Sequence, residues 1–596
     1  MIGEAVSRRS FLVVSAAAAA ALSGCSSGKH SSDPVATGQQ FSDAELNPSH
    51  GLGAEEANSP TVGGARGFVR VMLNEADGSS LAEERARLLH ARDLKNDPLP
   101  QAIKRAEGRV RVALADEPIQ MVCRLRIPQF GEVYVYADNE GKGYRKPGQI
   151  DFVTEAAKTR LHRVQEAVRK AKSLGIPNDP KLDWHLFAAA RPLPQQPGYA
   201  RTAAAYESLA HSMHAGEIFA LNAARHRISR LSERRKDFGF GVMVSRFGQT
   251  PAYDKAIEQA FNFATVCWYN WKSPEPPYVD YAPRMDPSID WCLARNITPK
   301  GFGYCYMARG ATPEWIRPTE IPAATQPADN NAPPPDPADA RREYNPQWPY
   351  DRLKTLYADI NRQTSRHYLE KYGDKVPHVE ILNEAHDKAN LWHMNHEQVL
   401  DIARTVAKAS REGHPRIKRQ INHCCQWGEY AVRRNTDGTR RWSPLTFARD
   451  CLSNGVEFET LGLQLYYPTY DVFEIDRMLA RHFVLGKPIH ITEMSTSSQP
   501  GQDLASMRPK NATACWHGDA WNETVQADWL EAIFTIAYSH PEIEVAEWWD
   551  LADVGGHFWP HGGLLNKDFT PRESYQRLLK IQKDWGVSRP AAMAKT

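Results

Sequence analysis

The sequence predicts an α/β protein whose larger part is a (β/α)8 TIM barrel, preceded by a β-rich accessory domain and a helical connection. Between about residues 236 and 586, eight short apolar segments alternate with amphipathic helical segments, as parallel strands and helices do in such a barrel. Ahead of residue 150, short segments with alternating apolar and polar residues follow one another, which is typical of a small β-rich module. A doubly wound open sheet is the competing fold, but no glycine-rich phosphate loop follows the first strand of the series.

The composition excludes several classes of protein. A length of 596 residues exceeds what one hydrophobic core usually organises, so two or more domains are expected. The chain is 42% hydrophobic and 24% charged, which excludes a disordered chain and a polytopic membrane protein. Its net charge of +2 offers no basic field to nucleic acid. The nine cysteines are too few for a disulfide scaffold, and no CxxC spacing supports a zinc site, so we expect no nucleic-acid partner, no metal and no cofactor.

The first 25 residues are predicted to be a targeting signal. Arg8-Arg9 precede an apolar run, Val13 to Leu22, that is too short to span a bilayer and resembles a twin-arginine export signal. The run ends in Leu22-Ser23-Gly24-Cys25, which resembles a bacterial lipobox whose cysteine, Cys25, becomes lipidated. We expect export by the twin-arginine route and a lipid anchor in the bacterial cell envelope, on its periplasmic or outer surface. Plain secretion and a cleaved soluble form are the alternatives.

Composition divides the rest of the chain into four segments. Residues 26–62 are rich in Ser, Gly, Asp and Asn and are expected to form a flexible tether. Residues 63–150 carry the alternating strand patterns of the accessory module, which either binds carbohydrate or packs against the rest of the chain. Residues 151–235 are predicted to be a helical connection, and residues 236–590 hold the predicted barrel.

The predicted barrel has eight strands with helices between them. We expect the strands at residues 238–244, 263–269, 301–307, 379–383, 416–424, 460–466, 488–493 and 543–549. Amphipathic helices are expected at residues 352–372, 397–411, 472–484 and 525–538. Residues 317–340 are packed with Pro and Ala, which predicts a long mobile loop on the rim of the barrel.

Two of these strands end in a carboxylate. The strand we count as the fourth runs into Asn383 and Glu384, and the seventh ends in Glu493. Active sites of barrels lie at the C-terminal ends of strands, so the fold would bring these distant acids to one site. Glycoside hydrolysis needs such a pair, because one carboxyl group protonates the leaving oxygen while the other attacks the anomeric carbon or activates water. Glu384 would then hold a proton at neutral pH and Glu493 would stay ionised. Either acid alone is more simply interpreted as an ordinary strand-end residue.

Further motifs occur in the same order as in glycoside hydrolase family 10, the clan A family of endo-β-1,4-xylanases. They are Asp237–Gly241, Phe261–Thr265, Trp271–Pro276, Thr312–Trp315, Asn383–Ala385, Gly462–Gln464, Ile491–Met494, and Gly562–Leu565 with Tyr575. The chain resembles this family over about residues 236–586 and nowhere before them. The resemblance implies a retaining mechanism with Glu384 as acid/base and Glu493 as nucleophile, with carboxyl groups about 5–5.5 Å apart. It also implies that Asn383 hydrogen-bonds the 2-hydroxyl of the sugar.

Three positions depart from the family pattern. Asn270 stands near the place of a sugar-binding Lys, Tyr466 follows Leu465 where a His supports the nucleophile, and Tyr306 lies near another missing His. Because buried polar groups discriminate strongly between substrates, the glycosidase prediction is better supported than the xylanase prediction. The Tyr466 hydroxyl can still hydrogen-bond Glu493, and Gln464 on the same strand is expected to contact substrate.

Aromatic residues make up 10% of the chain, and flat apolar rings suit the apolar faces of sugars. Trp548 and Trp549 end the eighth strand, where the family places a Trp that forms a sugar platform. Core packing is the alternative role for each of them.

We therefore expect a monomeric retaining glycoside hydrolase that acts on a β-linked polysaccharide, with endo-β-1,4-xylanase as the default activity. Its partners would be a polysaccharide or oligosaccharide and, through the lipid anchor only, a membrane. The alternative is a non-catalytic carbohydrate-binding envelope lipoprotein on a barrel scaffold, and a third hypothesis is an envelope scaffold whose barrel only packs. The presence of both Glu384 and Glu493 favours the enzyme, because binding alone does not need that pair.

Overall fold

The computed structural model describes residues 67–587, apart from residues 102, 107–108, 193–198, 234, 321–341, 387–389, 436–437, 467–468, 508–515 and 519. The expected signal with Cys25, the tether and most of the Pro-rich segment 317–340 lie outside the described residues. Among the described helices, none combines the length and the apolar character needed to cross a membrane.

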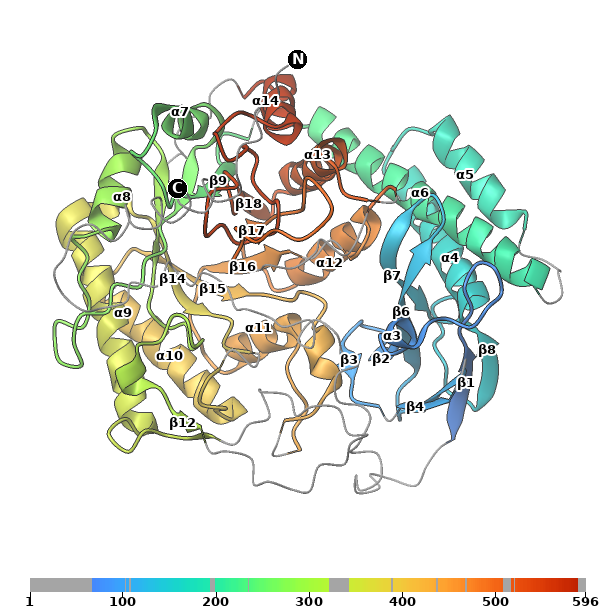
Figure 1. The fold of residues 1–596 in the computed structure, drawn as a ribbon, viewed down its shortest axis with the longest axis horizontal. Coiled ribbons are helices and arrows are strands. Elements are labelled where there is room, and N and C mark those ends of the chain that lie inside the picture. Colours follow the sequence, from blue (N-terminus) through green and yellow to red (C-terminus); the bar gives the residue numbers. More distant parts are fainter. Residues whose placement is uncertain are drawn as a thin grey trace, which may run out of the picture.

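Eight parallel strands close into a barrel, in the order β10-β11-β14-β15-β16-β17-β18-β9 (Figure 1). They are β9 (Gly239–Met243), β10 (Phe263–Thr265), β11 (Thr298–Phe302), β14 (His378–Asn383), β15 (Lys418–His423), β16 (Thr460–Leu465), β17 (Ile489–Met494) and β18 (Ile543–Trp548). Pairing of β18 with β9 completes the ring. The predicted (β/α)8 barrel is confirmed. Its third strand lies earlier than expected, because β11 ends at Phe302 and Tyr306 lies beyond it, in an isolated bridge to Asn383.

The helices that follow the strands surround the barrel (Figure 1). They are α7 (Pro251–Ala260), α8 (Met285–Leu293), α9 (Tyr350–Tyr372), α10 (His396–Gly413), α11 (Pro444–Ser453), α12 (Val472–Phe483), α13 (Glu523–Ser539) and α14 (Glu573–Asp584). Polar caps fix where several of them begin: Asp471 accepts from the backbone N of Phe473, and Asn522 from that of Val525. The short strands β12 (Thr319–Glu320) and β13 (Arg342–Glu343) pair with each other beside the barrel.

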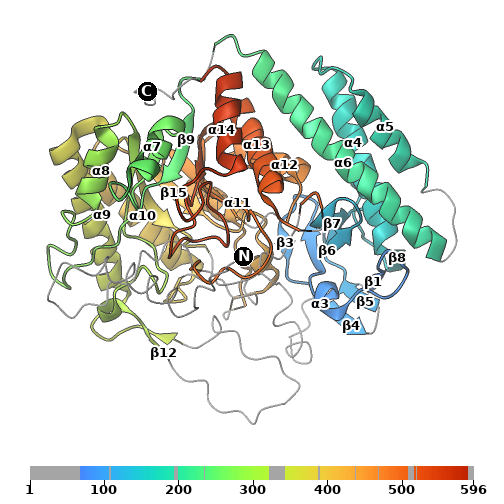
Figure 2. The same cartoon turned by 45° about the horizontal axis from the view of Figure 1, so that its top comes forward.

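Residues 67–233, which we call the N-terminal unit, contain two four-stranded sheets. One has the order β4-β5-β1-β8 and the other β3-β2-β6-β7. The strands are β1 (Phe68–Met72), β2 (His90–Asp93), β3 (Pro98–Leu99), β4 (Ile103–Ala106), β5 (Arg109–Ala113), β6 (Ile119–Ile127), β7 (Gly131–Ala137) and β8 (Gly148–Asp151). The helices are α3 (Glu83–Ala86), α4 (Phe152–Lys172), α5 (Pro180–Ala190) and α6 (Tyr199–Ser229). Helix α6 runs along the barrel helices α12 and α13 (Figure 2).

One continuous hydrophobic cluster extends from the N-terminal unit into the barrel. Val71 of β1 and Leu209 of α6 belong to it, as do Ile491 of β17 and Leu578 of α14, and all four are 0% exposed. Separating the two parts would therefore expose apolar surface to water, at a cost of roughly 25 cal/mol per Å².

The interior of the barrel is polar below the strand ends. Lys300 of β11 lies 3.2 Å from Glu547 Oε1 and 3.8 Å from Glu380 Oε2, and it is fully buried. Burial raises the pKa of Glu380 to about 7, although the Lys300 ammonium acts in the opposite direction. Gly241 makes room for this group, because a Cβ atom at that position would lie 2.2 Å from Cγ of Glu547.

Candidate active site

The two predicted acids meet at the same end of the barrel. Glu384 directly follows the last residue of β14, and Glu493 is the penultimate residue of β17. Glu384 is only 1% exposed to solvent, and Glu493 only 4%. The charge of Glu384 contributes to the raised pKa of Glu493, so the two side chains lie within electrostatic reach of each other. The parallel strands of the barrel thus bring together two carboxylates that are far apart in the chain.

Both carboxylate oxygens of Glu384 accept hydrogen bonds from neighbouring side chains. The Tyr306 hydroxyl donates to Oε2 at 2.9 Å, and Gln464 Nε2 donates to Oε1 at 2.6 Å. The backbone N of Glu384 donates to the carbonyl oxygen of Asn422 at 3.0 Å. The backbone has φ +49°, the left-handed region, which costs about 1–3 kcal/mol for a residue with a side chain. The contacts hold this strained conformation and fix the direction of the carboxylate.

Glu493 has a matching set of donors. The Tyr466 hydroxyl donates to Oε2 at 3.0 Å, which is the hydrogen bond expected from the sequence. Asn422 Nδ2 donates to Oε1 at 3.3 Å. Thr492 Oγ1 donates to Asn422 Oδ1 at 2.7 Å, which orients the amide so that its nitrogen faces Glu493. Each carboxylate is therefore held by one tyrosine hydroxyl and one side-chain amide.

Burial raises the pKa of Glu493 well above its ordinary value, and the charges of Glu384 and Glu380 add to the effect. The hydrogen bond from Tyr466 and the charge of Lys300 act in the opposite direction. This shift is opposite to the expectation that Glu493 readily stays ionised, because burial and neighbouring negative charges both disfavour the ionised form of a carboxyl group.

Gln464 links the two acids. The register between β16 and β17 shifts after Leu463, so that Gln464 lies opposite Glu493 while its side chain donates to Glu384. Its Nε2 also lies 3.5 Å from Asn383 Oδ1. The expected site residues Asn383, Gln464 and Tyr466 thus lie with the two glutamates.

The predicted tryptophans have different surroundings. Trp549 belongs to a buried cluster with Met243, Tyr466 and Phe558. Trp548 is fully buried, donates to the carbonyl oxygen of Gly562 at 2.9 Å and meets Trp529 edge to face, so it packs in the core. The partly buried Trp559 lies nearly parallel to Tyr466, with ring centroids 5.7 Å apart.

Asn270 lies in the connection after β10. The neighbouring ring of Tyr269 is 6.2 Å from that of Tyr306, the donor to Glu384. The Nδ2 atom of Asn270 is buried and has no hydrogen-bond partner among the described residues. Buried polar atoms that no described residue satisfies are commonly paired by water or a ligand.

Two site residues were missed by the sequence analysis. Asn422 is the penultimate residue of β15 and bonds Glu493. Unlike the segment before Asn383, this strand is largely polar, so no apolar run ahead of the amide marks Asn422. Tyr306 was noted only as a departure from the family pattern, and no local pattern identifies it as the donor to Glu384.

One cluster in the described residues brings three possible metal ligands together: Asp503, Asp553 and His557. Burial works to lower the pKa of His557, but Asp503, Asp550 and Asp553 raise it to about 9. The imidazolium lies 2.6 Å from Asp503, and Arg572 lies 2.6 Å from Asp553. Protonated His557 and Arg572 thus already neutralise the carboxylates, and the cluster joins the connections after β17 and β18.

No protein-family model and no curated protein matches the chain. Among solved structures, it is similar to the intracellular xylanase TsXylA of Thermoanaerobacterium saccharolyticum in complex with xylotetraose, at 16% identity and a TM-score of 0.41, over 57% of this chain and 95% of that one. It is also similar to xylanase XynB of Paenibacillus barcinonensis, at 17% identity and a TM-score of 0.40, over 58% and 95%. A third is an endo-1,4-β-xylanase of Caldicellulosiruptor owensensis, at 15% identity and a TM-score of 0.40, over 58% and 97%. Similarity at such low identity and TM-score says nothing about the activity of this chain. The closed ring of eight parallel strands itself identifies the chain as a (β/α)8-barrel protein.

Proposed function

We propose that the protein is a retaining glycoside hydrolase that acts on a β-linked polysaccharide. The observation that carries the proposal is the pair Glu384 and Glu493, buried at the ends of β14 and β17 and within electrostatic reach of each other. A pair of carboxyl groups at one end of a barrel is what glycosidic bond cleavage requires.

In the proposed mechanism, Glu493 attacks the anomeric carbon and Glu384 protonates the leaving oxygen. Water then displaces the sugar from Glu493 while Glu384 takes up the proton. The first step of this division needs one protonated and one ionised carboxyl group. Gln464 bonds Glu384 and lies beside Glu493, so it would keep the two groups aligned during both steps.

Xylan is the first substrate to test, because the motifs along the barrel resemble those of family 10. The replacements at Asn270 and Tyr466 would change which sugar hydroxyls are bound, so a different β-linked glycan is the next candidate. Purified protein would be incubated with xylans, mixed-linkage glucans and aryl β-glycosides. Proton NMR of the first product would give the anomer, and retention is expected.

The variants Glu384→Ala and Glu493→Ala test the roles of the two acids. Both should lose at least about 10³-fold in kcat, and azide should rescue them with opposite anomeric outcomes, β for Glu384→Ala and α for Glu493→Ala. The exposed Glu397→Ala in the first turn of α10 is the control and should keep full activity. If the wild type cleaves a glycan and both variants keep that activity, the assignment is wrong. If a glycan binds but none is cleaved, the carbohydrate-binding alternative replaces it.

We also propose that the chain is exported and lipidated at Cys25. The paired Arg8-Arg9, the apolar run and the lipobox-like Leu22–Cys25 support this. In a bacterial host, the full-length chain should incorporate labelled palmitate and partition into detergent, whereas Cys25→Ala should do neither. Replacing Arg8 and Arg9 by Lys should leave the precursor in the cytoplasm.

A further inference from the structure

The N-terminal unit contacts barrel connections at the end where Glu384 and Glu493 lie. The connection between β16 and α12 is held from two elements of the N-terminal unit, β7 and α4. Its Thr469 carbonyl oxygen accepts from the backbone N of Tyr134 in β7 at 2.8 Å. Asp471 accepts two hydrogen bonds from Arg160 of α4, at 2.7 and 3.2 Å. These contacts fix the segment that enters helix α12.

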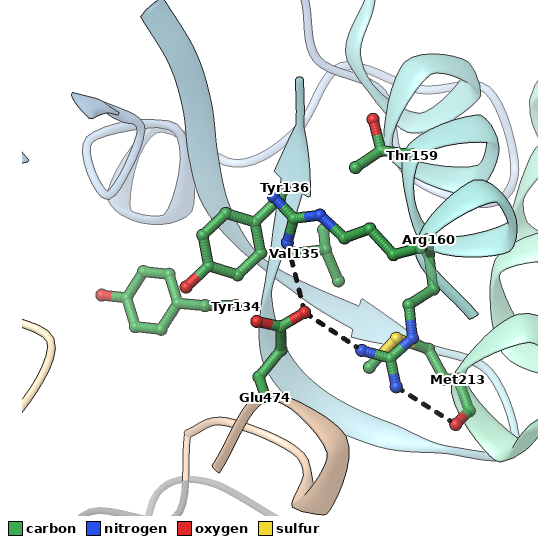
Figure 3. A pocket seen from close by; sticks show the side chains of 8 residues that line it. Tyr134, Val135, Tyr136, Thr159, Arg160, Met213 and Glu474 are labelled. Atoms are coloured by element: carbon green, nitrogen blue, oxygen red, sulfur yellow. Dashed lines mark hydrogen bonds and ion pairs between the residues drawn. The ribbon is translucent and has the colours of Figure 1, made fainter. Parts of the chain in front are cut away.

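A buried ion-pair network continues into the first turn of α12 (Figure 3). Glu474 lies 3.2 Å from Arg163 and 3.5 Å from Arg160, beside Tyr134 and Tyr136 of β7. Burial works to raise the pKa of Glu474, but Arg477, Arg163 and Arg160 lower it to about 2. The cavity between these residues measures about 10 Å³, room for about one water molecule. The junction is therefore closed and charged.

Glu217 of α6 joins two connections at once. Its Oε1 accepts from the backbone N of Val472, which begins α12, at 3.1 Å and from Trp516 Nε1 at 2.6 Å. Its Oε2 bonds His517 Nε2. Trp516 and His517 belong to the connection after β17, the strand that carries Glu493. A single carboxylate, 3% exposed, thus ties the connections after β16 and β17 to the N-terminal unit.

The tied segment begins close to the site. Tyr466, whose hydroxyl donates to Glu493, directly follows the last residue of β16. Only five positions further along lies Asp471, and Val472 follows it. A hydrogen bond to a reacting carboxylate needs a placement of about 0.5 Å, which a connection held at only one end does not ensure. Strand β16 leads directly into Tyr466, and the N-terminal unit holds Asp471 and Val472.

We propose that Glu217 is a positioning residue, through which the N-terminal unit holds Val472 at the start of α12 and so keeps Tyr466 on Glu493. The unit is then an integral part of the active barrel rather than a separable carbohydrate-binding module. The part of this proposal that concerns catalysis rests on the proposed glycosidase function. Buried ion pairs such as Arg160–Asp471, at 5% and 0% exposure, support it, because a separable module would join the barrel through an exposed linker.

A double-mutant cycle in the full-length chain tests this role of Glu217. Glu217→Met has a similar size but no acceptor, and it should lower kcat about tenfold with KM changed less than about twofold. In a Tyr466→Phe background, Glu217→Met should lower kcat less than about twofold, because the hydrogen bond from Tyr466 to Glu493 is already absent. Glu217→Gln keeps one acceptor oxygen for Val472 and Trp516 and should retain most of the activity. Equal losses in both backgrounds, or no loss at all, would overturn the proposal.

A matched control separates positioning from general stability. Asp286 of α8 is also a buried acid with a histidine partner, His367 of α9 at 2.7 Å, and it lies among the outer helices. Asp286→Leu should lower the melting temperature as Glu217→Met does, but it should leave kcat unchanged. A comparable loss of kcat in this control would assign the effect of Glu217 to stability alone.

Hydrogen exchange gives a readout that needs no activity. Glu217→Met should speed exchange of the backbone amides of Val472 and His517 by about fivefold or more and leave that of Glu384 unchanged. If wild type cleaves no glycan but these amides respond, the proposed function fails and the role of Glu217 in holding Val472 stands. If exchange at Val472 and His517 does not change in Glu217→Met, the proposed role of Glu217 is wrong, whatever activity is measured. Glu217→Gln provides the same comparison if the Met variant does not fold.

Discussion

The hydroxyl of Tyr466 donates a hydrogen bond of 3.0 Å to Oε2 of Glu493. This bond stabilises the ionised form of a carboxylate whose pKa is raised by burial and by the charge of Glu384. If the proposed glycosidase function holds, the uncharged phenol of Tyr466 takes the supporting place beside Glu493. Tyr466 thus contacts Glu493 and also begins the connection to α12, whose far end the N-terminal unit contacts.

Removing this hydroxyl should shift the pH dependence of the reaction. In Tyr466→Phe, loss of the donor raises the pKa of Glu493 further, and Glu493 must be ionised to attack. The acidic limb of kcat/KM should therefore move to higher pH, with a loss of about tenfold near neutrality. Initial rates between pH 4 and 9 measure this. Tyr575→Phe, which removes a buried hydroxyl bonded to the Ala256 carbonyl oxygen, should leave the limb in place. An unmoved limb in Tyr466→Phe would contradict the role of the bond.

The hydroxyl of Tyr306 should matter most for protonation of the leaving group. It holds Oε2 of Glu384, so Tyr306→Phe should misdirect the acid. We expect a loss of about tenfold in kcat/KM for aryl glycosides with poor leaving groups and little change for dinitrophenyl glycosides, which leave without a proton. A Brønsted plot over a series of phenols measures the difference. Equal losses for all leaving groups would argue that Tyr306 only supports packing.

The ion pair between His557 and Asp503 should make stability depend on pH. The pKa of His557 is raised to about 9, above the value of about 6.5 for an unfolded histidine. Its stabilisation, up to about 3 kcal/mol, is therefore fully present below about pH 6.5 and lost as pH rises through about 9. His557→Gln should lower the melting temperature strongly at pH 6 and little at pH 10. A deficit that does not change with pH would contradict a protonated His557.

The N-terminal unit and the barrel should unfold together. They share one hydrophobic cluster and the buried pair Arg160–Asp471, so calorimetry of the full chain should give one transition. Arg160→Met should cost about 3–5 kcal/mol, because it leaves Asp471 buried without its partner. Arg169→Met in the same helix removes an exposed pair with Glu166 and should cost less than about 1 kcal/mol. Two separate transitions would show that the parts are independent.

Much of the fold could be predicted from neighbours along the chain. The apolar strands that end in Glu384 and Glu493 are recognisable because burial inside a barrel demands continuous apolar runs, and the helices because their apolar residues recur with the helical period. The hydrogen bond from Tyr466 to Glu493 was also predictable, since both residues stand at the ends of strands that are consecutive in the series. Local patterns therefore sufficed for the barrel and for the two acids.

The tertiary structure decided the contacts around those acids. The shift of register after Leu463 sets Gln464 beside Glu493, and an isolated bridge brings Tyr306 to Asn383, so neither placement follows from sequence spacing. Trp548 faces the core and Trp549 the site cluster, which depends on the turn of the chain after β18. The sequence by itself determined which strands form and where their acids stand, because periodicity and strand-end chemistry are local. Only the folded chain decided which donors reach each acid and that Glu217 holds the connections beside them, because such pairings depend on distances between segments that lie far apart in the sequence.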